Sequence, residues 1–174
     1  MVITINGLNH KGSTYHIGRM LADALIFTTP NYCFGPSAQM KALIDLFFDF
    51  WMSHRPLPWM FHKKAVVLST CAGGGAAAAA KQVRRALRFM GVPYIRQYAT
   101  AVQAKNWEEV KPEKKAKIES VVAKLAASIQ RAGSPKPGLR SRFLFRMFSR
   151  MHAAGWDSSP VEKQYWIENG WIRE

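Results

Sequence analysis

The chain has 174 residues and a formal net charge of +14 at pH 7. This length is typical of one domain with a substantial core, and a hydrophobic share of 48% excludes extended disorder for most of it. The positive charge indicates an anionic partner, which could be a phosphate cofactor, nucleic acid or a membrane surface. The alternative is that these lysines and arginines simply face solvent.

The first predicted element is a strand over Val2–Ile5, a β-branched run. A polar loop before a helical segment follows it and contains Asn9, His10, Lys11, Gly12, Ser13 and Thr14. Free backbone amides, two hydroxyls, a cation and the positive end of a helix suit a phosphate group. A plain helix cap at Ser13 and Thr14 explains the same hydroxyls.

The second strand is the apolar run Leu25–Thr29, and we expect it to be buried on both faces. Pro30 should end it, because proline has no amide proton for a sheet ladder. A loop with Asn31, Tyr32, Cys33 and Phe34 follows, and then a helix begins near Ser37. Ligands of open α/β sheets bind beyond the carboxyl ends of the strands, which is where this loop falls.

The same order of strand, loop and helix returns at residues 65–90. An apolar strand over 65–69 leads into a loop with Cys71, Ala72, Gly73, Gly74 and Gly75, and five alanines then start a helix. Three glycines allow the backbone to pass close to a flat ligand. The pattern is not GxGxxG, so it does not predict a Rossmann dinucleotide site.

The stretch from Pro30 to Asp45 resembles the NADPH-dependent FMN reductase family, which consists of flavodoxin-like flavoproteins. The matching residues are Pro30, Tyr32, Ser37, Gln39, Met40, Lys41 and Asp45. The glycine loop is also similar to the family's loop beside the flavin ring. The first loop departs from the family pattern, because Leu8 and Asn9 replace Ser-Pro and His10 stands at an arginine position.

The resemblance implies a flavodoxin-like three-layer α/β/α sandwich whose parallel sheet has the order 2-1-3-4-5. It implies an oxidoreductase in which NAD(P)H reduces a small acceptor by hydride transfer through bound FMN. The acceptor could be a quinone, a nitro compound, free flavin or a metal complex. FMN would hold its phosphate on Asn9–Thr14 and its ring against Pro30–Phe34 and Cys71–Gly75. No side chain is expected to be catalytic, since the flavin takes the hydride, and a homodimer or tetramer is implied.

The connection between the first two strands is short, because only Tyr15–Ala22 separate the first helical segment from the next strand. Members of the family carry a further strand and helix here. A direct crossover would need its helix on the opposite face of the sheet to stay right-handed. Either the fold is rewired locally, or the molecule contains residues between about Arg19 and Ala24 that this sequence lacks.

The later elements are a last strand over 92–102 and an amphipathic helix that starts at Lys111 and ends near Gly133. The last strand is expected to end in a loop that need not contact the cofactor. Residues 134–138 are rich in proline and glycine and form the clearest linker. We therefore divide the chain into a flavodoxin-like FMN-binding domain, 1–133, and a basic, aromatic, helical extension, 134–174.

The extension contains an arginine stripe of Arg142, Arg146 and Arg150 beside an apolar stripe. Residues 139–151 could form an interfacial membrane helix or a helix that docks on a partner subunit. We favour docking, because the apolar face is short for stable anchoring.

Cys33 and Cys71 are too few for a disulfide scaffold, and the scattered histidines show no metal-ligand spacing. No signal peptide and no apolar run of roughly 20 residues is evident, so a cytoplasmic protein with reduced thiols is expected.

Two other functions remain open. One is a flavodoxin-like electron carrier for protein partners, and the other is a basic binding protein without cofactor. The basic charge weighs against the carrier, and no specific nucleic acid is expected.

Overall fold

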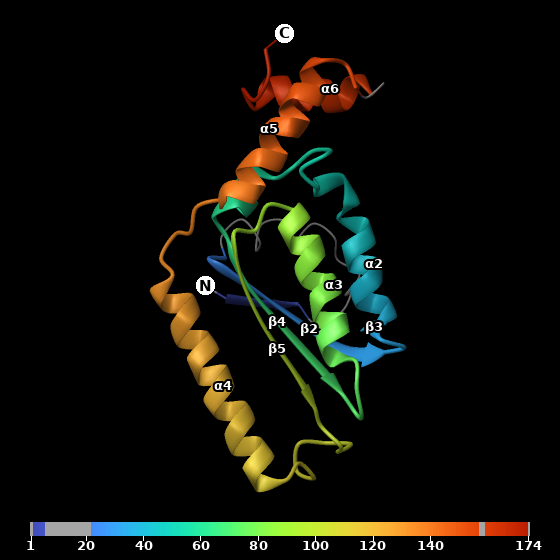
Figure 1. Ribbon diagram of the computed structural model, residues 1–174, viewed down its shortest axis with the longest axis vertical. Helices are drawn as coiled ribbons and strands as arrows, with labels where there is room; N and C mark the ends of the chain where they lie inside the picture. The colour runs from blue at the N-terminus through green and yellow to red at the C-terminus, as the bar shows by residue number, and fades with distance from the viewer. Residues whose placement is uncertain (1, 6–21, 157–158, 174) are drawn as a thin grey trace.

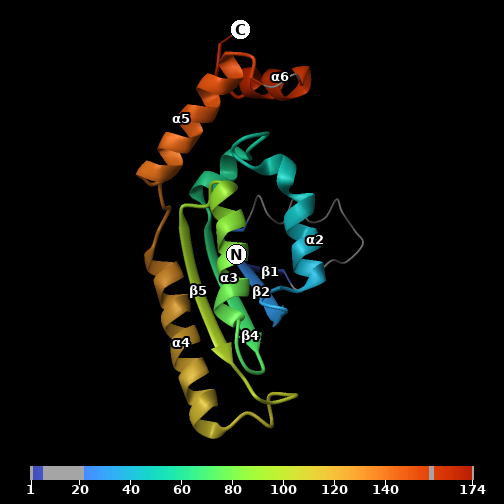
Figure 2. The same ribbon diagram turned by 45° about the vertical axis from the view of Figure 1, so that its right-hand side comes forward.

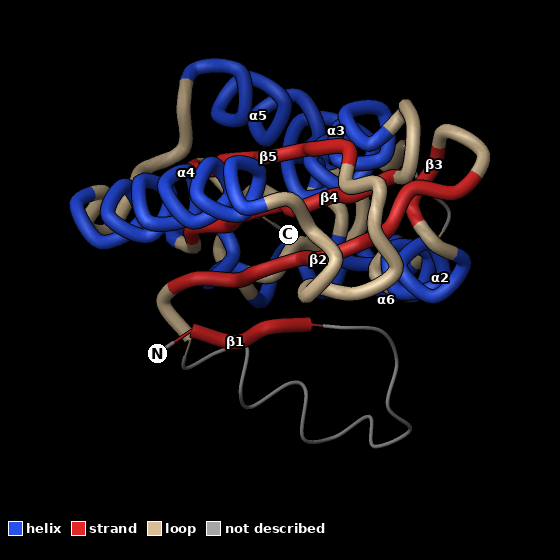
Figure 3. The backbone as a smooth tube through the Cα atoms, turned by 90° about the horizontal axis from the view of Figure 1, so that it is seen from below, coloured by secondary structure: helices blue, strands red, loops and turns tan. Residues whose placement is uncertain are grey.

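The computed structural model describes residues 2–5, 22–156 and 159–173. A sheet of four parallel strands forms its centre: β1 (Val2–Ile5), β2 (Ala24–Tyr32), β4 (Lys64–Cys71) and β5 (Tyr94–Ala101). Their order across the sheet is β1-β2-β4-β5, and Figure 3 shows them side by side in this order. The two-residue strand β3 (Gly35–Pro36) pairs antiparallel with the end of β2.

Helices cover both faces of the sheet. Figure 2 shows α2 (Ala38–Leu46) and α3 (Ala76–Phe89) on one side and α4 (Pro112–Arg131) on the other. Strand side chains alternate between the faces. The first core cluster contains Leu25, Phe27, Ala65 and Val67 with Met40, Val83 and Leu87, and the second contains Ala24 and Val66 with Ile129. The flavodoxin-like three-layer architecture is therefore confirmed.

The order of the strands agrees with the predicted sheet, with β1, β2, β4 and β5 in the places of strands 1, 3, 4 and 5. The prediction of a rewired or incomplete crossover concerns residues 6–21, which lie outside the described residues. That prediction stays open.

One predicted boundary is wrong. β2 does not end at Pro30 but continues to Tyr32, and Pro30 stays in register with Thr70 of β4. Among the described residues, the register with β1 ends at Phe27, so in this part of the chain Pro30 has a parallel ladder partner on the β4 side only. A residue without an amide proton is tolerated where a strand lacks a second ladder partner.

Local sequence explains the starts of the helices. Ser37 caps α2 by accepting a hydrogen bond from the Met40 amide at 3.3 Å. Two short 3-10 helices, η1 (Phe48–Phe50) and η2 (Pro58–His62), connect α2 to β4. Trp51 between them stacks on Phe89 of α3, with ring centroids 5.2 Å apart. This aromatic segment packs on the protein itself.

The extension forms α5 (Leu139–Ala153) and α6 (Pro160–Glu168). In Figure 1 both helices lie beyond the amino ends of β4 and β5, away from the edge at which these strands end. Trp166 is fully buried and stacks on Phe145 and His152, with centroids 5.2 and 4.5 Å away. Its indole donates a hydrogen bond to the carbonyl of His54.

The extension is therefore fixed on the chain's own segment 53–62. The Tyr165 hydroxyl donates to the Pro56 carbonyl at 2.8 Å, and His54 Nδ1 lies 3.1 Å from a Glu162 carboxylate oxygen. The division of the chain at residue 133 remains a prediction.

We expect Tyr165→Phe to lower the free energy of unfolding by about 1 kcal/mol, because the Pro56 carbonyl loses its donor. Burial raises the pKa of Tyr165, with weaker opposing effects of Arg55 and Asn169. The contribution of Tyr165 to stability is thus complete at pH values below the ordinary tyrosine pKa, and it is lost as the pH rises through the raised pKa of the folded protein. Urea denaturation at several pH values measures this difference. Tyr32→Phe, at a side chain that is 65% exposed, serves as the control and should change stability by less than about 0.5 kcal/mol.

Candidate functional site

A strained hairpin turn closes the carboxyl end of β2. Tyr32 pairs with Gly35, and between them Cys33 and Phe34 have φ values of 49° and 62°. This left-handed conformation costs a residue other than glycine roughly 1–2 kcal/mol, and such strain often occurs at binding sites. The turn holds two aromatic side chains in solvent, with Tyr32 65% and Phe34 71% exposed.

The glycine loop after β4 lies beside this hairpin. Asn31 Nδ2 donates a hydrogen bond to the Gly74 carbonyl at 2.9 Å. Gly75 caps α3 with φ of 92°, and a Cβ atom there would lie 2.8 Å from Asn31 Nδ2 and 2.9 Å from the Phe34 ring. Two of the three loops predicted to share a ligand are thus in direct contact at one edge of the sheet.

A cavity of about 710 Å³ opens at the same edge. Of the predicted site residues, it is lined by Pro30, Asn31, Tyr32, Cys71 and Ala72. The remaining predicted residues of these loops, Cys33, Phe34, Gly73, Gly74 and Gly75, do not line it. A Cβ atom at Gly73 or Gly74 would meet nothing within 4 Å, so the backbone of this loop is open to a ligand.

Three polar atoms of the cavity lining are buried without a hydrogen-bond partner among the described residues. They are Asn31 Oδ1, Ser69 Oγ and Tyr98 Oη. Buried polar atoms normally have partners, so the Tyr98 hydroxyl, on the α4 face of the sheet with Leu68, suits a ligand with a polar edge. Ser69 lies on the α3 face with Val67, and Asn31 contacts the glycine loop at the start of α3. The apolar part of the lining, which includes Leu68 and Val102, suits the flat apolar portion of the same ligand. FMN combines both kinds of surface.

Sequence reasoning missed one wall of the cavity. Tyr98, Thr100 and Val102 of the last strand and its end line it, together with Trp107 of the following loop and Ile118 of α4. From the sequence we expect that the loop after β5 need not contact the cofactor, and the predicted site therefore gives β5 and this loop no role. Tyr98 and Thr100 are two residues apart in β5 and therefore lie on the same face of the sheet. This alternation of side chains was the sequence signal that could have indicated the wall.

The predicted phosphate loop, Asn9, His10, Lys11, Gly12, Ser13 and Thr14, lies outside the described residues. Its role stays a prediction. Both cysteines are free, with Cys33 exposed and Cys71 half-buried. Among the helices that the structure describes, none has the length and apolar character needed to cross a membrane.

The fold is that of a flavodoxin-like α/β protein with a cavity at the carboxyl edge of its sheet. The family model for NADPH-dependent FMN reductase matches residues 2–106. The chain belongs to the NADPH-dependent FMN reductase family.

Solved structures agree in fold. The apo form of the NADH:FMN oxidoreductase EMOB is 19% identical with a TM-score of 0.51; the match covers 72% of this chain and 63% of that chain. A flavodoxin, WrbA-like protein from Agrobacterium tumefaciens is 20% identical with a TM-score of 0.52, and the match covers 69% and 74% of the two chains. This chain thus spans less than two thirds of the first of these structures. A comparison with curated proteins finds no match.

Proposed function

We propose that this protein is an NAD(P)H-dependent FMN oxidoreductase that reduces a small acceptor. The family supports an enzyme that uses FMN and a nicotinamide donor. The observation that carries the proposal is the contact of the two strand-end loops, joined by the hydrogen bond from Asn31 to Gly74, beside a cavity with unsatisfied polar atoms.

The ring of FMN would lie against Pro30–Phe34 and Cys71–Gly75, and its phosphate would bind Asn9–Thr14. The open backbone at Gly73 and Gly74 admits close approach of a flat ring. Tyr98 is placed to hydrogen-bond its polar edge, and the exposed rings of Tyr32 and Phe34 can shield it from water. When bound, FMN supplies the acceptance and return of a hydride, so the protein's task is binding and orientation.

The proposal also covers the electron acceptor, the oligomeric state, the cellular compartment and the division into domains. A quinone, a nitro compound, free flavin or a metal complex suits the hydride chemistry. We also propose a homodimer or tetramer in the cytoplasm, with residues 1–133 as the FMN-binding domain and 134–174 as its extension.

Titration of the purified full chain with FMN tests the function. We expect a yellow protein whose flavin absorbance bleaches on anaerobic addition of NADPH or NADH and returns on addition of a quinone. A protein that binds FMN but is reduced only by dithionite would instead support an electron carrier. A protein that stays colourless in excess FMN contradicts the proposal, and a shift of a nucleic-acid probe would then support the basic binding protein.

A further inference from the structure

A second cavity, of about 530 Å³, lies between α3 and the start of α5. We call it the basic groove. Its lining includes five cationic side chains, Lys81, Arg84, Arg85, Arg88 and Arg140, and no carboxylate. Phe89, Pro93 and Leu144 supply an apolar floor.

The spacing of the basic residues in α3 places them along one side of the groove. Lys81, Arg84, Arg85 and Arg88 recur at i, i+3, i+4 and i+7, which places them along one side of the helix. The opposite side is buried against the sheet through residues such as Val83 and Leu87. The helix contains no acidic residue, and like charges four residues apart repel each other. The positive charge of these four side chains is therefore not neutralised within α3.

Among the residues that the structure describes, no ion pair with an acid compensates this charge. The ion pairs of the described residues join Lys41 to Asp45, His54 to Glu162 and Arg55 to Asp49, and none includes a groove residue. Within the same part of the chain, the buried Nε of Arg84 has no hydrogen-bond partner.

Arg88 shows the effect of this crowding. Its pKa is lowered by burial first and then by the positive charges of Arg84 and Arg140. An anion in the groove would relieve this repulsion and give Arg84 a partner.

The start of α5 adds to the positive potential. The first backbone bond of this helix runs from the Arg142 amide to the Gly138 carbonyl, so the preceding amides have no partner within the helix. Gly138 is its N-cap, no side chain caps it, and its first turn has no acid. Gly138 and Ser141 both line the groove, and a free helix start favours negative charge.

We propose that the basic groove binds a small ligand with two or more phosphate groups. The four arginines of the groove provide planar, forked donors that match phosphate oxygens, and the apolar floor can accept an organic part such as a base. Arg84 lies nine residues after Gly75, about 13 Å further along α3. The groove is thus separate from the proposed flavin site, and Figure 1 shows α5 next to the carboxyl-terminal end of α3.

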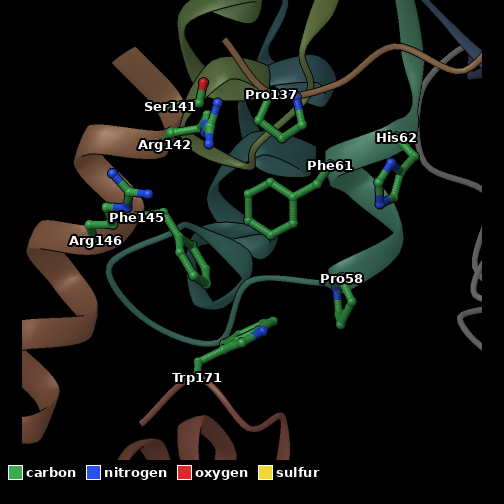
Figure 4. Close-up of a pocket in the computed structure, with 9 residues that line it drawn as sticks. All are labelled: Pro58, Phe61, His62, Pro137, Ser141, Arg142, Phe145, Arg146 and Trp171. Atoms are coloured by element: carbon green, nitrogen blue, oxygen red, sulfur yellow. The ribbon is translucent and has the colours of Figure 1, made fainter. Parts of the chain in front are cut away.

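The chain offers a matched control on the other side of α5. Figure 4 shows Arg142 and Arg146 at a neighbouring apolar pocket of about 360 Å³, where Phe61, Phe145 and Trp171 gather. Arg142→Gln with Arg146→Gln removes the same charge as Arg84→Gln with Arg88→Gln, but outside the basic groove.

Calorimetric titration of the full, FMN-loaded chain with inorganic tripolyphosphate and with ATP tests the proposal. Each charged hydrogen bond is worth about tenfold to a hundredfold in affinity, so Arg84→Gln with Arg88→Gln should weaken tripolyphosphate binding about a hundredfold or more. The control pair should change it less than about threefold. Equal losses in both variants, or no binding by the unchanged protein, would overturn the proposal.

Two further measurements separate the sources of phosphate and the two proposals. Binding to phosphatidylserine vesicles that tripolyphosphate does not displace would contradict a groove ligand and assign the charge to a lipid surface. Circular dichroism should show that both variants are folded. Bleaching by NADPH should be unchanged in Arg84→Gln with Arg88→Gln, so failure of the redox function and failure of the groove are distinguishable. The single variant Arg140→Gln, at an exposed position, keeps the test valid if the double variant does not fold.

Discussion

Gly75→Ala is expected to separate the two loops of the candidate flavin site and to release bound FMN. The new Cβ would have to occupy space 2.8 Å from Asn31 Nδ2 and 2.9 Å from Phe34, on a residue with φ of 92°. The left-handed backbone alone costs about 1–2 kcal/mol for alanine, and forced overpacking adds about 1–3 kcal/mol. Asn31 must move, so its hydrogen bond to Gly74 breaks.

Two measurements check this expectation: FMN affinity by fluorescence titration, and stability of the FMN-free protein in urea. Both should fall for Gly75→Ala. Gly73→Ala is the control for stability, because its Cβ would meet nothing within 4 Å, and it should change the free energy of unfolding by less than about 0.5 kcal/mol. Unchanged affinity and stability in Gly75→Ala would show that the two loops are not held as described.

Trp166→Ala should destabilise the extension by about 3–5 kcal/mol, the usual cost of removing a large buried aromatic side chain. Trp166 is fully buried, stacks on Phe145 and His152, and donates to the His54 carbonyl. We expect α5 and α6 to detach from segment 53–62, and limited proteolysis should then cleave the linker at 134–138 first.

The control for this variant is Trp156→Ala, since Trp156 is 51% exposed and its loss should cost about 1 kcal/mol or less. A Trp166→Ala protein that resists protease and unfolds at the same urea concentration would contradict the role of this side chain as the anchor.

The predictable part of the fold followed from local patterns. Buried apolar runs located β2 and β4, and the glycine and alanine sequence located the start of α3. The side-by-side placement of Asn31 and Gly74 followed from the rule that parallel strands end at a common edge. The order of the strands came from the family resemblance.

The unpredicted part depends on contacts distant in sequence. Pro30 continues β2 because, among the described residues, β2 pairs at this position with β4 and no longer with β1. The periodicity of apolar residues does not indicate which strands pair with one another. The docking of Trp166 on His54 spans 112 residues, and Phe145 became part of the aromatic cluster only because α5 lies across η2. The role of Tyr98 as a cavity wall required the packing of α4 over β5.

The position of the extension has a practical consequence. The helices α5 and α6 lie beyond the amino ends of β4 and β5, away from the edge at which these strands end and at which β3 lies. Immobilising the protein on an electrode through α6 would orient the molecules with the candidate flavin edge toward the solution. Soluble acceptors would reach that edge freely, whereas direct current from the electrode would have to cross the length of the sheet.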